Sequence, residues 1–256
     1  MKFLAFILLC CIAIPSRAQI AIAAASDLRD AMDEIAARFE SEYKAHVTVS
    51  YGSSANFYQQ LQNGAPFDLF FSANTEYPKK LQSAGLVAGD SYYEYARGRI
   101  VLLVSSTSKL DLTRGLSVLL DPAVKKIAIA DPSHAPYGQA AVAALKSQGF
   151  YDRVSGKLVT GENISQAASF VLSGAADVGI VAKSLVVSPK ESNRSRYIEI
   201  PASTYPPIQQ ACVILKSAKR QKLAREFESF VQQSASVNIF KKYGFEVPDS
   251  RTKSVQ

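Results

Sequence analysis

The hydrophobic pattern of the chain changes repeatedly between short apolar runs and segments with helical spacing. The apolar run 20–25 predicts a buried strand, and the segment after it places Ile35 and Phe39 on one face of a helix. Runs at 47–51 and 69–71 predict two more strands, each followed by a helix. The first part of the chain is therefore expected to alternate between strands and helices.

The same alternation continues through the rest of the chain. It predicts strands at 100–104, 126–130, 157–160, 177–181, 197–200 and 210–215, and helices at 116–120, 139–148, 164–173 and 222–233. Strands that alternate with helices are typical of an α/β protein, in which a mostly parallel sheet carries helices on both faces.

The order of these elements predicts two lobes. A second alternating unit, residues 100–201, is inserted into the first, because the last strand and helices complete the sheet that the N-terminal part begins. Lobe 1 is therefore expected to be discontinuous, with residues 19–99 and 202–248. Two crossings, near 96–100 and 200–205, predict a hinge, and a cleft between hinged lobes is a common ligand site.

Both ends of the chain are expected to lie outside the folded lobes. Residues 1–18 combine an early lysine, an apolar core and a small-residue exit, which is typical of a secretory signal peptide and predicts a periplasmic protein. The polar residues 249–256 are expected to form a disordered tail. Cys10 and Cys11 would leave with the signal peptide. Cys212 lies in an apolar run, which favours a buried small hydrophobic residue over a catalytic thiol.

Charge and composition argue against several classes of function. The formal net charge of +7 includes Lys2 and Arg17 of the predicted signal peptide, and removal of these two charges leaves +5. The basic residues form scattered pairs, so a nucleic-acid partner is not expected. The chain has no Gly-x-Ser-x-Gly motif, and its two histidines, His46 and His134, lack the spacing of metal ligands. We therefore expect neither an enzyme, nor a metal site built from side chains, nor a cofactor.

Two serines follow predicted strands of the first lobe at points where helices begin. Ser26 directly follows the run 23–25, and Ser54 follows the strand 47–51. A helix N-terminus has unpaired N–H groups and a partial positive charge, which together favour anion binding. Because the carboxyl ends of parallel strands gather ligands, we expect both serines to face one anion. The simpler interpretation is that each serine only caps a helix.

Seven blocks of sequence carry a family resemblance. They are AAAS at 23–26, YGSS at 51–54, GAPFDLF at 64–70, ADPSHAPYG at 130–138, GENI at 161–164, DVGIV at 177–181 and FKKYGF at 240–245. In this order and spacing the chain resembles the periplasmic molybdate-binding proteins of molybdate ABC transporters. The resemblance implies a two-lobed type II periplasmic-binding-protein fold whose cleft closes on molybdate or tungstate. It also implies delivery of the oxyanion to a membrane permease with a cytoplasmic ATPase.

The resemblance further implies which groups contact the ligand. Ser26 and Ser54 match the serines of the first lobe, and the backbone N–H groups of Tyr137 and Ile164 match the donors of the second. Asp27 follows Ser26 where several family members have an apolar residue. Either the Ser26 hydroxyl or the Asp27 backbone N–H would then meet the ligand, since a carboxylate would repel a dianion.

One family contact has no counterpart at the matching position. Several members place a tyrosine hydroxyl on the ligand directly after the strand 177–181, and this chain has Ala182 there. The side chain of Tyr137 is a candidate to replace that hydroxyl. Molybdenum would be held only as the oxyanion through the residues named above, and a monomer is expected.

The chemistry of the ligand agrees with a site made of donors. Molybdate and tungstate carry no proton at neutral pH, so they only accept hydrogen bonds, whereas phosphate keeps a proton that needs an acceptor. Sulfate has the same charge and shape as molybdate, so the size of the closed cleft would have to exclude it. A binding protein for sulfate and a solute-sensing domain of a receptor are therefore the alternatives.

Overall fold

The structure, a computed structural model, describes residues 18–188 and 193–248. The predicted signal peptide, apart from its last residue, and the predicted tail 249–256 lie outside the described residues. Within the described ranges, no helix combines the length and the apolar character needed to cross a membrane.

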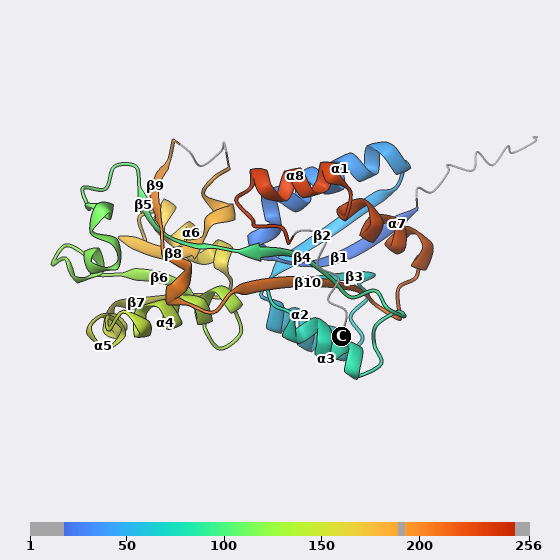
Figure 1. Ribbon diagram of the computed structural model, residues 1–256, viewed down its shortest axis with the longest axis horizontal. Helices are drawn as coiled ribbons and strands as arrows, with labels where there is room; N and C mark the ends of the chain where they lie inside the picture. Colours follow the sequence, from blue (N-terminus) through green and yellow to red (C-terminus); the bar gives the residue numbers. More distant parts are fainter. Residues whose placement is uncertain (1–17, 189–192, 249–256) are drawn as a thin grey trace, which may run out of the picture.

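Ten strands of the described chain form two five-stranded sheets (Figure 1). The first sheet has the order β2-β1-β3-β10-β4, with β1 (Gln19–Ala25), β2 (His46–Gly52), β3 (Leu69–Ser72), β4 (Tyr93–Gly98) and β10 (Ile208–Ile214). The second has the order β7-β6-β8-β5-β9, with β5 (Ile100–Ser105), β6 (Ile127–Ala130), β7 (Leu158–Gly161), β8 (Val178–Ala182) and β9 (Ser195–Glu199). In each sheet only one strand, β10 or β5, runs against its neighbours. The prediction of an α/β fold with two mostly parallel sheets is confirmed.

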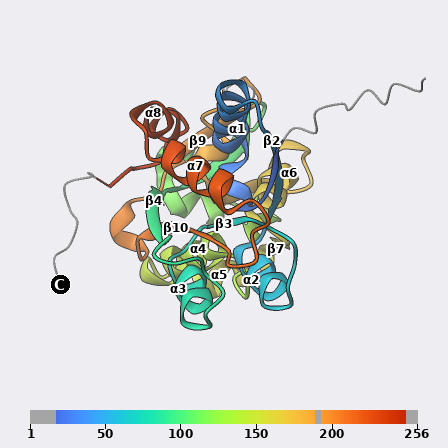
Figure 2. The same ribbon diagram turned by 90° about the vertical axis from the view of Figure 1, so that its right-hand side faces the viewer.

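Helices cover both faces of each sheet (Figures 1 and 2). One face of the first sheet carries α1 (Arg29–Tyr43), α7 (Gln221–Val231) and α8 (Ser234–Lys242), and the other carries α2 (Ser54–Gln62) and α3 (Glu76–Ser83). The second sheet lies between α6 (Ile164–Leu172) and α4 (Pro136–Ser147), which is followed by α5 (Tyr151–Val154). Short 3-10 helices complete the described chain: η1 (Ser26–Leu28), η2 (Leu112–Leu120), η3 (Ser155–Lys157), η4 (Lys183–Leu185) and η5 (Ala202–Thr204).

Two elements near the cleft differ from the prediction. Residues 93–98 form β4, which the hydrophobic pattern did not predict, because the strand that pairs with it, β10, is distant in the sequence. Helix α4 begins at Pro136 instead of 139, so that Tyr137 belongs to its first turn. Proline is common at the first position of a helix, because its missing N–H is not needed there and its φ is already helical.

The chain passes between the two sheets twice. Arg99 alone separates β4 from β5, and residues 200–207 connect β9 to β10. The two crossings are hydrogen-bonded to each other, because Ile200 N donates to Ile100 O (3.1 Å) and Ile100 N donates to Tyr205 Oη (3.3 Å). We refer to each sheet with its helices as lobe 1 and lobe 2. The exact boundaries of the two lobes stay a prediction.

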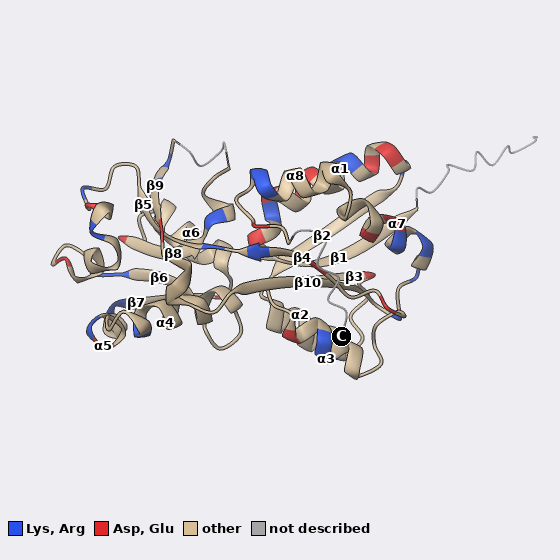
Figure 3. Cartoon of the chain, viewed as in Figure 1, with Lys and Arg blue, Asp and Glu red and all other residues tan. Residues whose placement is uncertain are grey.

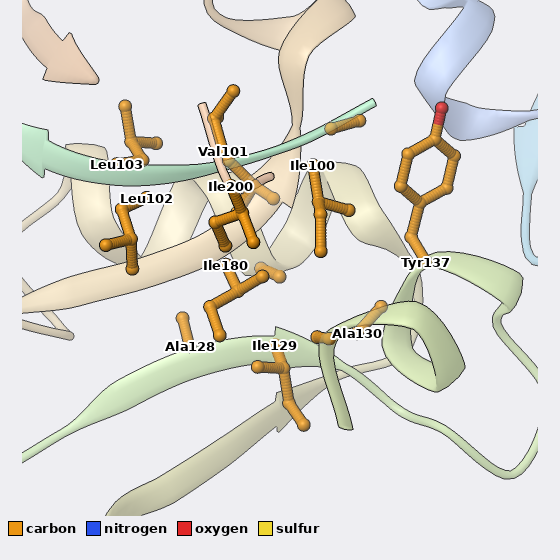
Figure 4. Packing of buried hydrophobic residues seen from close by; sticks show 14 of the residues in the cluster. Ile100, Val101, Leu102, Leu103, Ala128, Ile129, Ala130, Tyr137, Ile180 and Ile200 are labelled. Carbon is orange, nitrogen blue, oxygen red and sulfur yellow. The ribbon is translucent and has the colours of Figure 1, made fainter. Parts of the chain in front are cut away.

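Each lobe has a core of its own. In lobe 2, apolar side chains of β5, β6 and β8 pack against one another between the helices, among them Leu102, Ile129 and Ile180 (Figure 4). In lobe 1, the fully buried ring of Phe227 on α7 meets Phe39 of α1 edge-on, with centroids 5.0 Å apart, and Phe71 of β3 at 6.1 Å. Such aromatic pairs each add about 0.5–1.5 kcal/mol beyond the burial of their surface. The aromatic cluster therefore packs α7 against α1 and against β3 of the first sheet.

We expect Phe227→Ala to lower the free energy of unfolding by about 3–5 kcal/mol, the range for large aromatic side chains removed from a core. Urea denaturation followed by circular dichroism measures this loss. Tyr197→Ala is the control, because this aromatic side chain is 40% exposed and its removal should change the stability by less than about 0.5 kcal/mol. Equal losses in both variants would contradict the assignment of Phe227 to the core.

Candidate functional site

The carboxyl ends of the strands in the two lobes face each other across one cleft. Ala25 of β1 pairs with Gly52 of β2 in lobe 1, and Ala130 of β6 pairs with Gly161 of β7 in lobe 2, so the segments after these strands share an edge. Between the two edges lies a cavity of about 10 Å³. Its lining residues are Ala25, Ser26, Asp27, Gly52, Ser53, Ser54, Ala73, Ala135, Pro136, Tyr137, Asn163 and Ile164. A cavity of this size holds about one water molecule, so the lobes are closed on each other. All five residues predicted for the site line this cavity.

The hydroxyl groups of Ser26 and Ser54 keep a proton that can be donated. Both side chains are almost fully buried. Ser54 Oγ accepts a hydrogen bond from Ala73 N (2.9 Å) within lobe 1, and Ser26 Oγ accepts one from Ser165 N (3.3 Å) of lobe 2. A hydroxyl has one donor proton besides its lone pairs, so accepting these bonds leaves the proton available.

The interpretation of Ser26 and Ser54 as helix caps is wrong. The cap of α2 is Ser53, whose Oγ accepts from Asn56 N at 3.4 Å. Ser26 is the first residue of η1, which follows Ala25 without a side-chain cap. The short 3-10 turn η1 lies between β1 and α1, and it buries Ser26 and Asp27 at the boundary between the lobes.

Helix starts in lobe 2 supply backbone donors. Tyr137 is the second residue of α4, and Ile164 is the first residue of α6. N–H groups in the first turn of a helix have no partner within the helix and lie at its positive end. Gly138 allows α4 to begin against the end of β6, since a Cβ at this position would lie 2.2 Å from Ala130 O.

A buried polar network joins the lobes directly behind the cavity. Asp27 Oδ2 accepts hydrogen bonds from Tyr137 Oη (2.8 Å) and from Gln210 Nε2 (2.7 Å). Tyr95 Oη donates to Gln210 Oε1 (2.7 Å), and all four side chains are at most 2% exposed. Figure 4 shows the Tyr137 hydroxyl directed away from the lobe 2 core, toward the blue ribbon of the N-terminal part. The Tyr137 side chain, considered as a replacement for the missing family hydroxyl, is thus bonded to Asp27.

Asp27 lies in an environment that disfavours its charge. Burial raises the pKa of its carboxyl to about 6, and the hydrogen bonds from Gln210 and Tyr137 offset this only in part. Its other oxygen, Oδ1, is the one buried side-chain nitrogen or oxygen without a hydrogen-bond partner within residues 18–188 and 193–248. Burial and hydrogen bonding to Asp27 also hold the pKa of Tyr137 well above its usual value, so this phenol stays protonated.

Further hydrogen bonds cross the cleft beside the cavity. Ser53 Oγ donates to His134 O at 2.9 Å, and Ala55 N donates to the same oxygen at 3.3 Å. On the opposite side, Ser184 Oγ of η4 donates to Asp27 O at 2.7 Å. These bonds satisfy polar groups of one lobe with groups of the other, so they form only when the lobes are closed.

The hydrophobic pattern did not identify Tyr95, Ser165, Ser184 or Gln210. Of these four, Gln210 could have been found from the sequence, because it is a polar residue in the largely apolar segment that forms β10. Cys212 in the same strand is fully buried, as predicted, and burial raises the pKa of its thiol well above the usual value.

The chain is similar to known proteins over nearly its full described length. A family profile described as bacterial extracellular solute-binding protein matches residues 20–246. The molybdate-binding protein ModA of Rhodobacter capsulatus is 37% identical over 91% of this chain and 91% of its own length. The solved periplasmic molybdate-binding protein of Azotobacter vinelandii superposes with a TM-score of 0.84 at 32% identity, covering 90% of this chain and 99% of that one. The sulfate-binding protein SubI of Mycobacterium tuberculosis shares the fold, with a TM-score of 0.76 at 15% identity over 91% of this chain and 88% of that one.

Gly138→Ala tests the close approach that positions the start of α4. The added Cβ would meet the backbone oxygen of Ala130 at 2.2 Å, so either the strand or the helix must shift. We expect a loss of about 1–3 kcal/mol in the free energy of unfolding, as at other overpacked sites. Gly156→Ala in the same lobe is the matched control, because no atom lies within 4 Å of its added Cβ. Equal denaturation midpoints for both variants would show that α4 does not depend on this contact.

Proposed function

This chain belongs to the bacterial extracellular solute-binding proteins, a family of binding proteins and not of enzymes, and we propose that it is the molybdate-binding component of an ABC importer. In this proposal the cleft between the lobes closes on molybdate or tungstate. The observation that carries the proposal is the set of donors around the cavity. Two buried serines of lobe 1 and the first residues of two helices of lobe 2 line this cavity, and their hydroxyl and N–H groups are the proposed donors.

The cavity has donors but no cationic side chain. Lys and Arg residues are spread over both lobes (Figure 3), and none belongs to the described residues that line the cavity. Each hydrogen bond to a charged oxyanion contributes on the order of 1.5–3 kcal/mol. Five such bonds amount to roughly 7.5–15 kcal/mol, against the roughly 8 kcal/mol of a micromolar affinity and the additional costs of ordering and desolvation. Hydroxyl and N–H donors near the upper end of this range can therefore bind a dianion without an arginine.

The proposed contacts are the hydroxyls of Ser26 and Ser54 and the backbone N–H groups of Tyr137 and Ile164. The Asp27 backbone N–H is the alternative to the Ser26 hydroxyl, and the Asp27 carboxyl is not a contact because it is bonded to Tyr137 and Gln210. Molybdenum has no bond to the protein in this arrangement and is held only through the oxygens of the oxyanion.

The cellular setting of the protein follows from the same proposal. A signal peptide over residues 1–18 would export the chain to the periplasm, where it would act as a monomer. The loaded, closed form would then deliver its ligand to the membrane permease of the importer. These steps agree with the extracellular family to which the chain belongs.

We expect molybdate and tungstate to raise the melting temperature, and sulfate and phosphate at the same concentration to leave it unchanged. A ligand that binds only the folded protein stabilises it by about 2.7 kcal/mol at a concentration one hundred times its Kd. A thermal scan with the four oxyanions measures the effect. Equal stabilisation by sulfate would contradict the proposed selectivity for molybdate, and a sulfate-binding protein shares this fold.

Ser54→Ala should weaken molybdate binding ten- to a hundredfold, because it removes one charge-assisted hydrogen bond of about 1.5–3 kcal/mol. Isothermal titration calorimetry measures the change. Ser91→Ala is the matched control: this buried serine also accepts a backbone N–H, from Ile214 at 3.0 Å, but it does not line the cavity. The control should lose stability and keep the native affinity. An unchanged affinity of Ser54→Ala would remove this hydroxyl from the site.

A further inference from the structure

The carboxyl of Asp27 creates a conflict of charge inside the proposed site. Asp27 lines the cavity in which a dianion is proposed to bind, and a carboxylate there would repel that dianion. The side chains of Tyr137 and Gln210 both donate to Asp27 Oδ2, while Asp27 Oδ1 has no hydrogen-bond partner in the described part of the chain. A buried and incompletely bonded carboxylate is costly, and a proton on the carboxyl removes both this cost and the repulsion.

We propose that Asp27 is a proton-coupled latch: at mildly acidic pH its carboxyl takes up a proton from solvent when the lobes close on the oxyanion, and it releases this proton when the lobes open. This inference rests on the proposed function, because binding of the oxyanion drives the closure.

The latch depends on closure because its parts belong to different lobes. Asp27 is in η1 of lobe 1, and Tyr137 is in α4 of lobe 2. Gln210 is in β10, directly after the second crossing, and it also donates to Tyr137 Oη at 3.0 Å. Tyr95 holds the Gln210 amide by donating to Oε1, so that Nε2 faces Asp27. Separation of the lobes removes Tyr137 and admits water to the carboxyl, so Asp27 loses its solvent only in the closed form.

The titratable groups that contact Asp27 directly or through Gln210 are the phenols of Tyr137 and Tyr95. Burial holds the pKa of both phenols well above the usual value, so neither supplies charge. Three charged groups on or next to the elements packed against η1 have partners elsewhere: Arg29 of α1 lies over the Tyr51 ring of β2, Lys183 of η4 pairs with Glu199, and Glu162 before α6 accepts from Asn56. The pKa of Asp27 is set by burial and hydrogen bonds, and not by a neighbouring charge. His134, in the loop before α4, lies beside Ser53 and Asp131. No cation therefore compensates the Asp27 carboxylate among the described residues.

The direction of the pH effect follows from the pKa of Asp27. This pKa is raised from 3.8 to about 6 in the closed form, so the closed form binds more protons than the open one. Closure is favoured at low pH, and the advantage disappears as the pH rises through about 6. The dianion beside the carboxyl raises this pKa further, because like charges oppose ionisation. The linkage then predicts molybdate affinity at least roughly fourfold weaker at pH 7.5 than at pH 5.5.

Calorimetry can count the proton directly. Molybdate is titrated into the full mature chain at pH 6.0 in two buffers that differ in ionisation enthalpy, and the difference in the measured heat gives the protons taken up per ligand. We expect an uptake of at least about half a proton at pH 6.0 and almost none at pH 8.5. Binding without proton uptake at pH 6.0 would overturn the latch and leave the proposed function intact. Absence of binding would overturn both.

Three variants test whether Asp27 is the group that takes up the proton. Asp27→Asn should bind without proton uptake and with an affinity that does not change between pH 5.5 and 7.5. His134→Gln, the control at a side chain beside Ser53 in the cleft, should keep the uptake. Tyr137→Phe removes a donor that lowers the pKa of Asp27, so it should take up more protons than the native protein at pH 7.0. This variant also serves as the test if Asp27→Asn does not fold. Uptake retained in Asp27→Asn would place the proton on the ligand or on another group and would overturn the proposal.

Discussion

The first-turn N–H groups of a helix cannot bond within that helix, and this constraint organises the boundary between the lobes. Several of them are satisfied across the cleft. Ser165 N of α6 donates to Ser26 Oγ of the opposite lobe, and Ala55 N of α2 donates to His134 O. Others, at the starts of α4 and α6, lie at the cavity itself. Closing the lobes therefore pairs two of these donors, and the proposed site uses others for a ligand that only accepts hydrogen bonds.

The cavity at this boundary is lined by no positive side chain and by one acid among the described residues. A cavity lined by hydroxyls and N–H groups suits a small dianion, because it supplies donors at fixed positions without an arginine that would bind oxyanions more broadly. Asp27 is tolerated at this cavity because Tyr137 and Gln210 bond one of its oxygens and because burial raises its pKa. Asp27, the residue that is least expected at an anion site, thus connects β10, the start of α4 and the cavity.

Much of the fold and part of the site could be predicted from the sequence. Apolar runs followed by helical spacing identified most of the sheet strands, and the return of the last strand to the first unit gave the two-lobed order. The five residues Ser26, Asp27, Ser54, Tyr137 and Ile164 line one cavity because the carboxyl ends of parallel strands share an edge. Strand β4 was missed, since its pairing with β10 joins segments that are distant in the sequence.

The sequence by itself determined the local elements, because periodicity, turn residues and helix starts depend on neighbours within a few positions. Only the tertiary structure decided the roles of side chains at the cleft. It made Ser53 and not Ser54 the cap of α2, and it turned the Tyr137 hydroxyl toward Asp27. It also placed Gln210 against a carboxylate that precedes it by 183 positions. Hydrogen bonds of this kind depend on how the two sheets meet, and no local pattern in the chain records that orientation.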